Sequence, residues 1–167
     1  MNQAFLPASQ LRPCQLISAA SGSLVYSSDM GSTVFLVGSG DTPYVIILAS
    51  SEEDLPAGSA WLQKQTNSWS GLEVGKLHIR VDALSRIPPK TGRPALSILR
   101  SANRLYLNCR PPEPNGQRIM AEIADDLPTG WGDMIEVFTR WQLVAIDDGK
   151  EVVVHTVDVT PNQTPAR

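Results

Sequence analysis

The chain has 167 residues, of which 42% are hydrophobic and 19% charged, and its formal net charge is −3. This composition predicts one globular domain and argues against a disordered chain or a histone-like basic protein. The sequence has no run of about eighteen apolar residues, which a membrane helix requires. Pro7, Arg12 and Pro13 interrupt the N-terminal segment where a secretory signal would be continuous, so we expect a cytoplasmic protein without a membrane partner.

The first half of the chain contains short segments rich in apolar and β-branched residues and bounded by turn residues, which is typical of strands. These candidate strands are 14–19, 23–27, 32–39, 43–50 and 60–65. Gly40-Asp41-Thr42 separates two of them and predicts a hairpin. Gly38-Ser39-Gly40-Asp41 follows a strand, as a phosphate-binding loop would, but it lacks the later glycine and the helix. We therefore interpret it as the hairpin turn.

The middle of the chain contains four further candidate strands, at 76–82, 93–100, 103–110 and 117–124. Ser101-Ala102 separates the second from the third and predicts another hairpin. Three Pro-, Gly- or Ser-containing segments are too short to tether independent cores, so we expect them to be loops within one domain. These segments are 51–59, 85–93 and 110–117.

The C-terminal part contains the clearest pair of strands, 135–146 and 151–159, joined by the Asp-Gly turn of Asp147–Lys150. Three consecutive valines, 152–154, predict a strand that is buried on both faces or bulged at one point. A second interpretation remains open, because apolar residues in 133–145 also recur near helical spacing. A helix there would make the fold α+β.

Eight to ten short strands with turn signals about every 8–12 residues are typical of a β-sandwich or a barrel. The sequence therefore predicts a mainly β fold, a single antiparallel domain over residues 1–159, with α+β as the alternative. The tail, 160–167, lacks apolar residues, and we expect it to be disordered.

Charge is segregated along the sequence. Nine basic and two acidic residues lie between Lys76 and Arg118, which gives this segment a net charge of +7. Residues 1–75 carry −4 and residues 119–167 carry −6. A basic segment of this kind, inside structured β elements, favours an anionic partner.

Two of the candidate strands carry a polar row on one side. Alternation directs Leu105, Leu107 and Cys109 to the core. The opposite side of the same strand carries Arg104, Tyr106, Asn108 and Arg110, and the polar row of 76–82 carries Lys76, His78 and Arg80. If the two strands share a sheet, the rows form one basic face with an aromatic ring in it.

That combination predicts a surface for single-stranded nucleic acid, because cations neutralise phosphates and an aromatic ring stacks on a base. In this hypothesis Arg104 and Arg110 contact phosphate, and Tyr106 stacks. The residues that extend the positive track are Lys76, Arg80, Arg86, Lys90 and Arg93, with His78 and Asn108 in the same rows.

Other interpretations of the charge pattern remain open. The acidic thirds of the chain can pair with the basic third inside the fold. The basic face can also bind an acidic protein surface or a polyanionic glycan. Finally, it can meet the acidic C-terminal third of another copy, which makes an assembly module and a homo-oligomer the alternative function.

We find no pattern that predicts catalysis, a metal or a cofactor. Cys14 and Cys109 are far apart in sequence, and we expect two free thiols. His155 alternates with valines and is expected in the core. Asp125-Asp126 with Glu122 are more simply explained as an acidic turn than as a metal site. Two loop tryptophans, Trp69 and Trp131, are secondary candidates for stacking.

Overall fold

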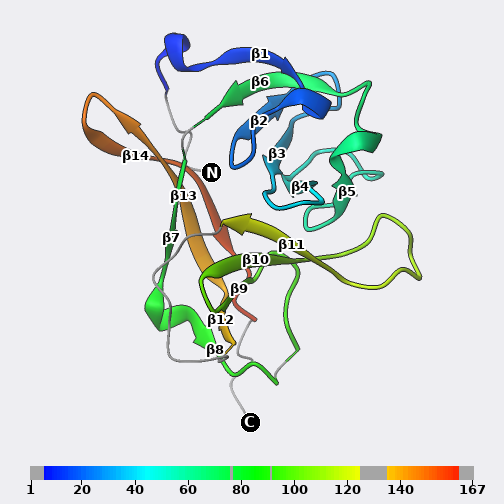
Figure 1. Cartoon of the computed structure of the whole chain (residues 1–167), viewed down its shortest axis with the longest axis vertical. Helices are drawn as coiled ribbons and strands as arrows, with labels where there is room; N and C mark the ends of the chain where they lie inside the picture. Colours follow the sequence, from blue (N-terminus) through cyan, green and yellow to red (C-terminus); the bar gives the residue numbers. More distant parts are fainter. Residues whose placement is uncertain (1–5, 76, 91, 125–134, 162–167) are drawn as a thin grey trace.

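The computed structural model describes residues 6–75, 77–90, 92–124 and 135–161. Within these ranges the chain forms fourteen strands, arranged in three antiparallel sheets, and four 3-10 helices of three residues each (Figure 1). The mainly β fold predicted from the sequence is confirmed. None of the helices in this described part is long and apolar enough to cross a membrane.

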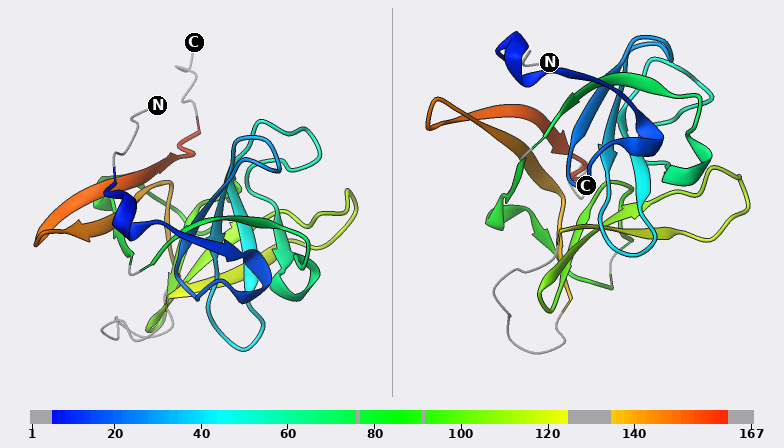
Figure 2. Two further views of the ribbon diagram at one scale, coloured as in Figure 1. Left: turned by 90° about the horizontal axis from the view of Figure 1, so that it is seen from above. Right: turned by 45° about the horizontal axis from the view of Figure 1, so that its top comes forward.

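The first sheet has six strands, all from the first half of the chain. Its order is β1 (Arg12–Gln15), β6 (Ser70–Val74), β2 (Leu24–Ser27), β3 (Thr33–Val37), β4 (Tyr44–Ala49) and β5 (Ala60–Leu62). The predicted β3–β4 hairpin is confirmed by their antiparallel pairing. The sheet curls, as Figure 2 shows, so that one face encloses a small core that includes Leu16, Val25, Phe35 and Ile47.

Two 3-10 helices link the edges of the curled sheet. The helix η2 (Leu16–Ser18) follows β1 and the helix η3 (Gln63–Gln65) follows β5, and both begin where we predicted longer strands. The buried Gln63 amide donates to the carbonyls of Leu16 and Ala19, at 2.8 and 2.9 Å. These bonds connect the two ends of the sheet, yet the strands do not pair into a closed barrel.

The other two sheets come from the second half of the chain. One has the order β11 (Ile119–Ala124), β10 (Arg104–Cys109), β9 (Ile98–Ser101), β12 (Glu136–Phe138) and β8 (Arg86–Ile87). The other has the order β14 (Lys150–Asp158), β13 (Arg140–Asp147) and β7 (His78–Val81), and its β13–β14 hairpin projects from the body in Figure 1. A fourth 3-10 helix, η4 (Ala83–Ser85), connects β7 to β8, and η1 (Ala8–Gln10) precedes β1.

The main core lies between the curled sheet and the other two sheets. Leu36 and Ile46 enter it from the first half of the chain, and Leu107 and Trp141 enter it from the second. The indole nitrogen of Trp141 donates to the carbonyl of Leu96 at 2.8 Å, which satisfies the one polar atom of this fully buried side chain. One apolar cluster therefore joins all three sheets.

The helix considered for 133–145 is wrong, because residues 136–138 and 140–147 form β12 and β13. Thr139 alone separates these strands, which belong to different sheets. The predicted bulge is confirmed: Leu143 pairs with His155 and Val144 with Val153, which leaves Val154 as the extra residue of β14. Most of the predicted disordered tail, 162–167, lies outside the described residues.

Two strands were not predicted. One is β6, where Gly71 interrupts the apolar pattern, and the other is the two-residue β8. Gly71 is required by a close approach of β2, because a Cβ atom at this position would lie 2.4 Å from the carbonyl oxygen of Tyr26.

Candidate binding sites

The two polar rows predicted from the sequence do not form one sheet face. The first, on β7, belongs to the three-stranded sheet, and the second, on β10, belongs to the five-stranded sheet. Local alternation correctly gave the side of each strand on which the cations lie, but strand pairing separates the rows. Lys76 lies outside the described residues.

Four arginines of the basic segment form ion pairs within the fold. On the three-stranded sheet, Arg80 reaches across β13 to Glu151 at 2.5 Å. On the five-stranded sheet, Arg86 and Arg100 lie on either side of Glu136, each at 3.7 Å. The fourth pair joins Arg104 to Glu122 at 3.3 Å. Much of the basic segment is thus neutralised internally, as the alternative interpretation of the charge pattern expected.

The polar row of β10 is partly covered by a strap, residues 93–97. Asn108 is only 2% exposed, and its amide donates to the carbonyls of Arg93 and Pro94 at 2.8 and 2.9 Å. The backbone nitrogen of Leu96 donates to the carbonyl of Asn108 at 2.7 Å. Asn108 therefore serves to hold the strap and is not available to a ligand, whereas Tyr106 stays half-exposed.

The strap brings arginines from three segments to one end of the β10–β11 pair. Arg118 donates a hydrogen bond of 2.5 Å to the carbonyl of Arg93, and the Arg93 side chain donates to the carbonyl of Pro89. Arg110 follows Cys109, which pairs with Ile119, so Arg110 lies at the same end of the ladder as Arg118. We call Lys90, Arg93, Arg110 and Arg118 the arginine end.

No carboxylate pairs with the arginine end within the described part of the chain. Each guanidinium has five donors, and the bonds of Arg93 and Arg118 to backbone carbonyls leave most of them open. Arg110, Arg118 and Lys90 are exposed, and Arg93 is half-buried. The described Lys and Arg residues of 77–118 thus divide into four arginines that pair with carboxylates and the arginine end. Arg118, in that end, was not among the predicted binding residues.

The remaining candidates are exposed on another sheet, packed in a core or outside the described ranges. His78 is exposed on β7. Trp69 packs in the small core, with its ring centroid 5.5 Å from Phe35 and 5.6 Å from Trp61. Trp131 and Asp125-Asp126 lie outside the described residues. Within the described ones, no group of three or more metal-ligating side chains comes together.

The two thiols and His155 show how burial acts on ionisable groups in this fold. Both cysteines are free. Burial raises the pKa of Cys109 to about 12, and burial together with the nearby Glu73 carboxylate raises the pKa of Cys14. Burial lowers the pKa of His155, because the charged imidazolium loses water. None of these shifts activates a nucleophile at neutral pH.

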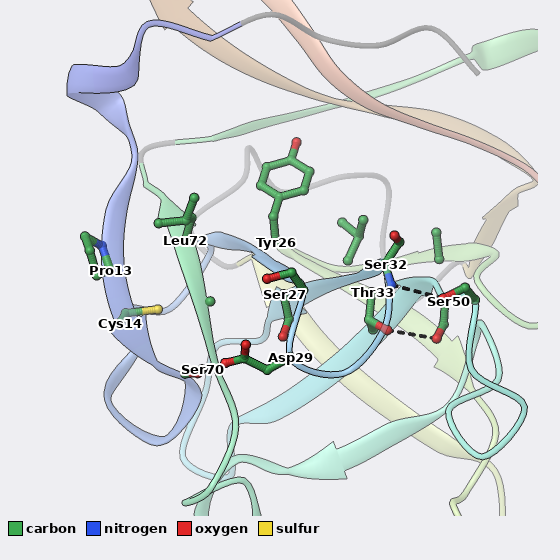
Figure 3. Close-up of a pocket in the computed structure, with 15 residues that line it drawn as sticks. Pro13, Cys14, Tyr26, Ser27, Asp29, Ser32, Thr33, Ser50, Ser70 and Leu72 are labelled. Carbon is green, nitrogen blue, oxygen red and sulfur yellow. Dashed lines mark hydrogen bonds between the residues drawn. The ribbon is translucent and has the colours of Figure 1, made fainter.

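A second candidate site is a groove of about 820 Å³ beside the ends of β2, β3 and β4, shown in Figure 3. Pro13 and Cys14 line it from β1, and Ser70, Gly71 and Leu72 line it from β6. The serine and threonine residues along it are Ser27, Ser28, Ser32, Thr33, Ser50, Ser51 and Ser70. The only charged side chain that lines it among the described residues is Asp29.

The sequence analysis missed this groove. Its signal was present as two serine pairs, Ser27-Ser28 and Ser50-Ser51, each at the end of a buried strand. Nothing local indicated that the ends of these strands, far apart in sequence, open onto one space. A pocket of this size is within the usual range for small-molecule sites, and barrel-like mouths commonly hold them.

Comparison with known proteins gives a family for the chain. No curated protein and no solved structure matches it. A family model described as "Uncharacterised protein y4lG" matches residues 13–165, so the chain belongs to the Y4lG family.

Proposed function

We propose that the chain is a non-enzymatic binding protein whose arginine end holds an anionic polymer, with single-stranded nucleic acid as the ligand. The observation that carries this proposal is the convergence of Arg93, Arg110 and Arg118 without a described carboxylate partner. Four other arginines of the same segment pair with carboxylates, so among its described residues this group remains to bind an external anion.

The geometry favours an extended ligand with repeated negative charges. Arg93 and Arg118 are held by backbone carbonyls, so their remaining donors are oriented before binding. A planar guanidinium binds phosphate through two parallel hydrogen bonds. Tyr106, Asn108 and Arg110 alternate onto the same side of this segment, with Tyr106 two residues before Asn108. Tyr106 supplies a half-exposed ring for stacking on a base.

The test measures fluorescence anisotropy of a labelled oligothymidylate at low and moderate salt. The triple variant Arg93→Gln/Arg110→Gln/Arg118→Gln should lose most of the affinity at low salt. It should also reduce the salt slope by about two units, since each phosphate contact on a single strand contributes about 0.7. Tyr106→Ala should weaken binding by about 1–3 kcal/mol with the slope largely unchanged.

A matched control removes the same charge from the paired arginines. Arg80→Gln/Arg86→Gln/Arg140→Gln replaces three side chains that are each about half exposed and bound to a carboxylate. This variant should bind the oligonucleotide like the unaltered chain. Equal losses in both triple variants, or no binding of the unaltered chain at low salt, would contradict the proposal.

A second candidate function, assembly with another copy of the chain, is supported by β14. This strand has nine residues and lies at the edge of its sheet, with Val153 37% exposed and Ile146 of the paired strand 44% exposed. Long exposed edges are templates for pairing with another strand. Light scattering across protein concentrations should then show a dimer that Val153→Lys dissociates, and a monomer at all concentrations would exclude it.

A further inference from the structure

We propose that the groove in Figure 3 binds a neutral, polyhydroxylated ligand, a short oligosaccharide. This site is separate from the arginine end, since none of the residues that line it belongs to that group. The inference is therefore independent of the proposed function.

The charge of the groove excludes anions and selects a neutral ligand. No Lys or Arg lines it within the described part of the chain, so a phosphate or carboxylate would find no cation. The one carboxylate, Asp29, is exposed and accepts a hydrogen bond from Ser70 at 2.7 Å. An exposed carboxylate attracts an ammonium only weakly in water, but its remaining lone pairs can accept bonds from sugar hydroxyls.

A buried hydroxyl without a partner points to a ligand group at the groove. Ser27 is 5% exposed, and its Oγ atom has no hydrogen-bond partner among the described residues, although buried polar groups normally have one. Thr33, on the neighbouring strand, is satisfied, since it donates to Met30 and contacts Ser50 at 2.9 Å. The unsatisfied Ser27 is therefore a particular feature of this wall.

The groove also offers apolar surface, as the C–H faces of a sugar ring require. Leu72 is 42% exposed although it is a large aliphatic side chain, and Figure 3 shows it beside the ring of Tyr26. Val34 and Ala49 continue this surface. Hydroxyls that both donate and accept, next to apolar patches, match the alternating polar and apolar edges of a pyranose.

The experiment uses the full chain with three neutral trisaccharides, maltotriose, cellotriose and N-acetylated chitotriose. Saturation-transfer NMR detects contact, and titration gives the affinity. We expect at least one of them to bind, with Asp29→Asn and Ser27→Ala each weakening the affinity several-fold. Ser27→Ala should leave the Tm of the free chain unchanged or raised, because it removes an unsatisfied buried hydroxyl.

Two controls make the result specific. Ser23→Ala removes a buried hydroxyl that donates to Ala20 at 2.6 Å and does not line the groove, so it should lower the Tm and leave sugar binding unchanged. Arg118→Gln should also leave it unchanged. The proposal would be overturned if none of the three sugars received saturation transfer from the unaltered chain. It would also be overturned if Asp29→Asn and Ser27→Ala each bound the sugar as tightly as the unaltered chain, or if spermidine bound more tightly than every sugar.

Discussion

Both halves of the chain pack β-sheets around apolar cores, but they differ in their polar side chains. Residues 6–75 form one curled sheet with its own small core, and the described part of this half contains no ion pair. The five ion pairs of the described residues all lie between Arg80 and Glu151, in the second half of the chain. Hydroxyls line the groove of the first half, whereas arginines lie at one end of the second.

This difference teaches that net charge alone is a poor guide to where a ligand binds. The described part of the second half has ten Lys and Arg residues, but five of them pair with carboxylates that the fold brings close. Surface ion pairs contribute little to stability, about 0–1 kcal/mol each. Their main effect here is to neutralise the positive electrostatic potential of the arginines. The informative residues are the exceptions, which are the unpaired arginines in one half and the unpaired hydroxyl of Ser27 in the other.

The largest expected effect tests whether the halves share one core. Trp141→Ala removes a buried indole that packs in the cluster joining all three sheets, so the free energy of unfolding should fall by about 3–5 kcal/mol. Urea denaturation followed by circular dichroism should show a single transition. Two separate transitions in the unaltered chain would show that the halves unfold independently and would break the comparison.

A smaller effect is expected where β6 pairs with β2 in the curled sheet. Gly71→Ala places a methyl group against the backbone of Tyr26, so we expect a loss of about 1–3 kcal/mol from overpacking. Gly75→Ala is the matched control, because a Cβ atom there meets nothing within 4 Å. Thermal denaturation of both variants measures the contrast, and equal Tm values would contradict the close approach.

The smallest effect is a pH dependence confined to the second half. The pKa of His155 lies below its ordinary value of 6.5, because burial disfavours the charged form. As the pH falls below 6.5, the unfolded chain therefore gains a proton before the folded chain does, and the free energy of unfolding decreases. The contribution is fully present above 6.5.

Urea denaturation at a series of pH values should show that the free energy of unfolding decreases below pH 6.5. In His155→Gln this dependence on pH should be weaker. The carboxylates act in a separate window. Hydrogen bonds from Leu84 and Arg140 lower the pKa of Asp82, and Thr160 lowers that of Asp158, so their contributions are lost only in stronger acid.

Most strands could be predicted from the sequence because alternation and turn residues are local signals. The side of β10 on which Tyr106 and Arg110 lie follows from the same alternation. The strand β6 was not predicted because Gly71 interrupts its apolar pattern. Glycine is needed there because of the close backbone of β2, which is distant in sequence. The sheet to which β7 and β10 belong depends on long-range pairing, and no local pattern carries that information.

The candidate sites were predictable only in part for the same reason. Arg93 and Arg110 could be proposed from the charge pattern, but the strap that unites them with Arg118 depends on Asn108, which is buried by a turn of the chain fifteen residues away. The groove depends on five strands, β1, β2, β3, β4 and β6, whose residues meet in space. Nothing in the local sequence around Ser27 and Ser50 indicates that they line a groove, because the groove exists only in the curled sheet.

The junction at Thr139 has a consequence for how this family can vary in length. One residue carries the chain from β12 to β13, and it is held by the carbonyl of Ser85 and by Val159. An added residue here would exchange the inward and outward sides of β13, placing Arg140 where Trp141 packs. The exposed loop at 112–117 carries no such constraint. Natural insertions should therefore accumulate in that loop, while the spacing between β12 and β13 stays fixed.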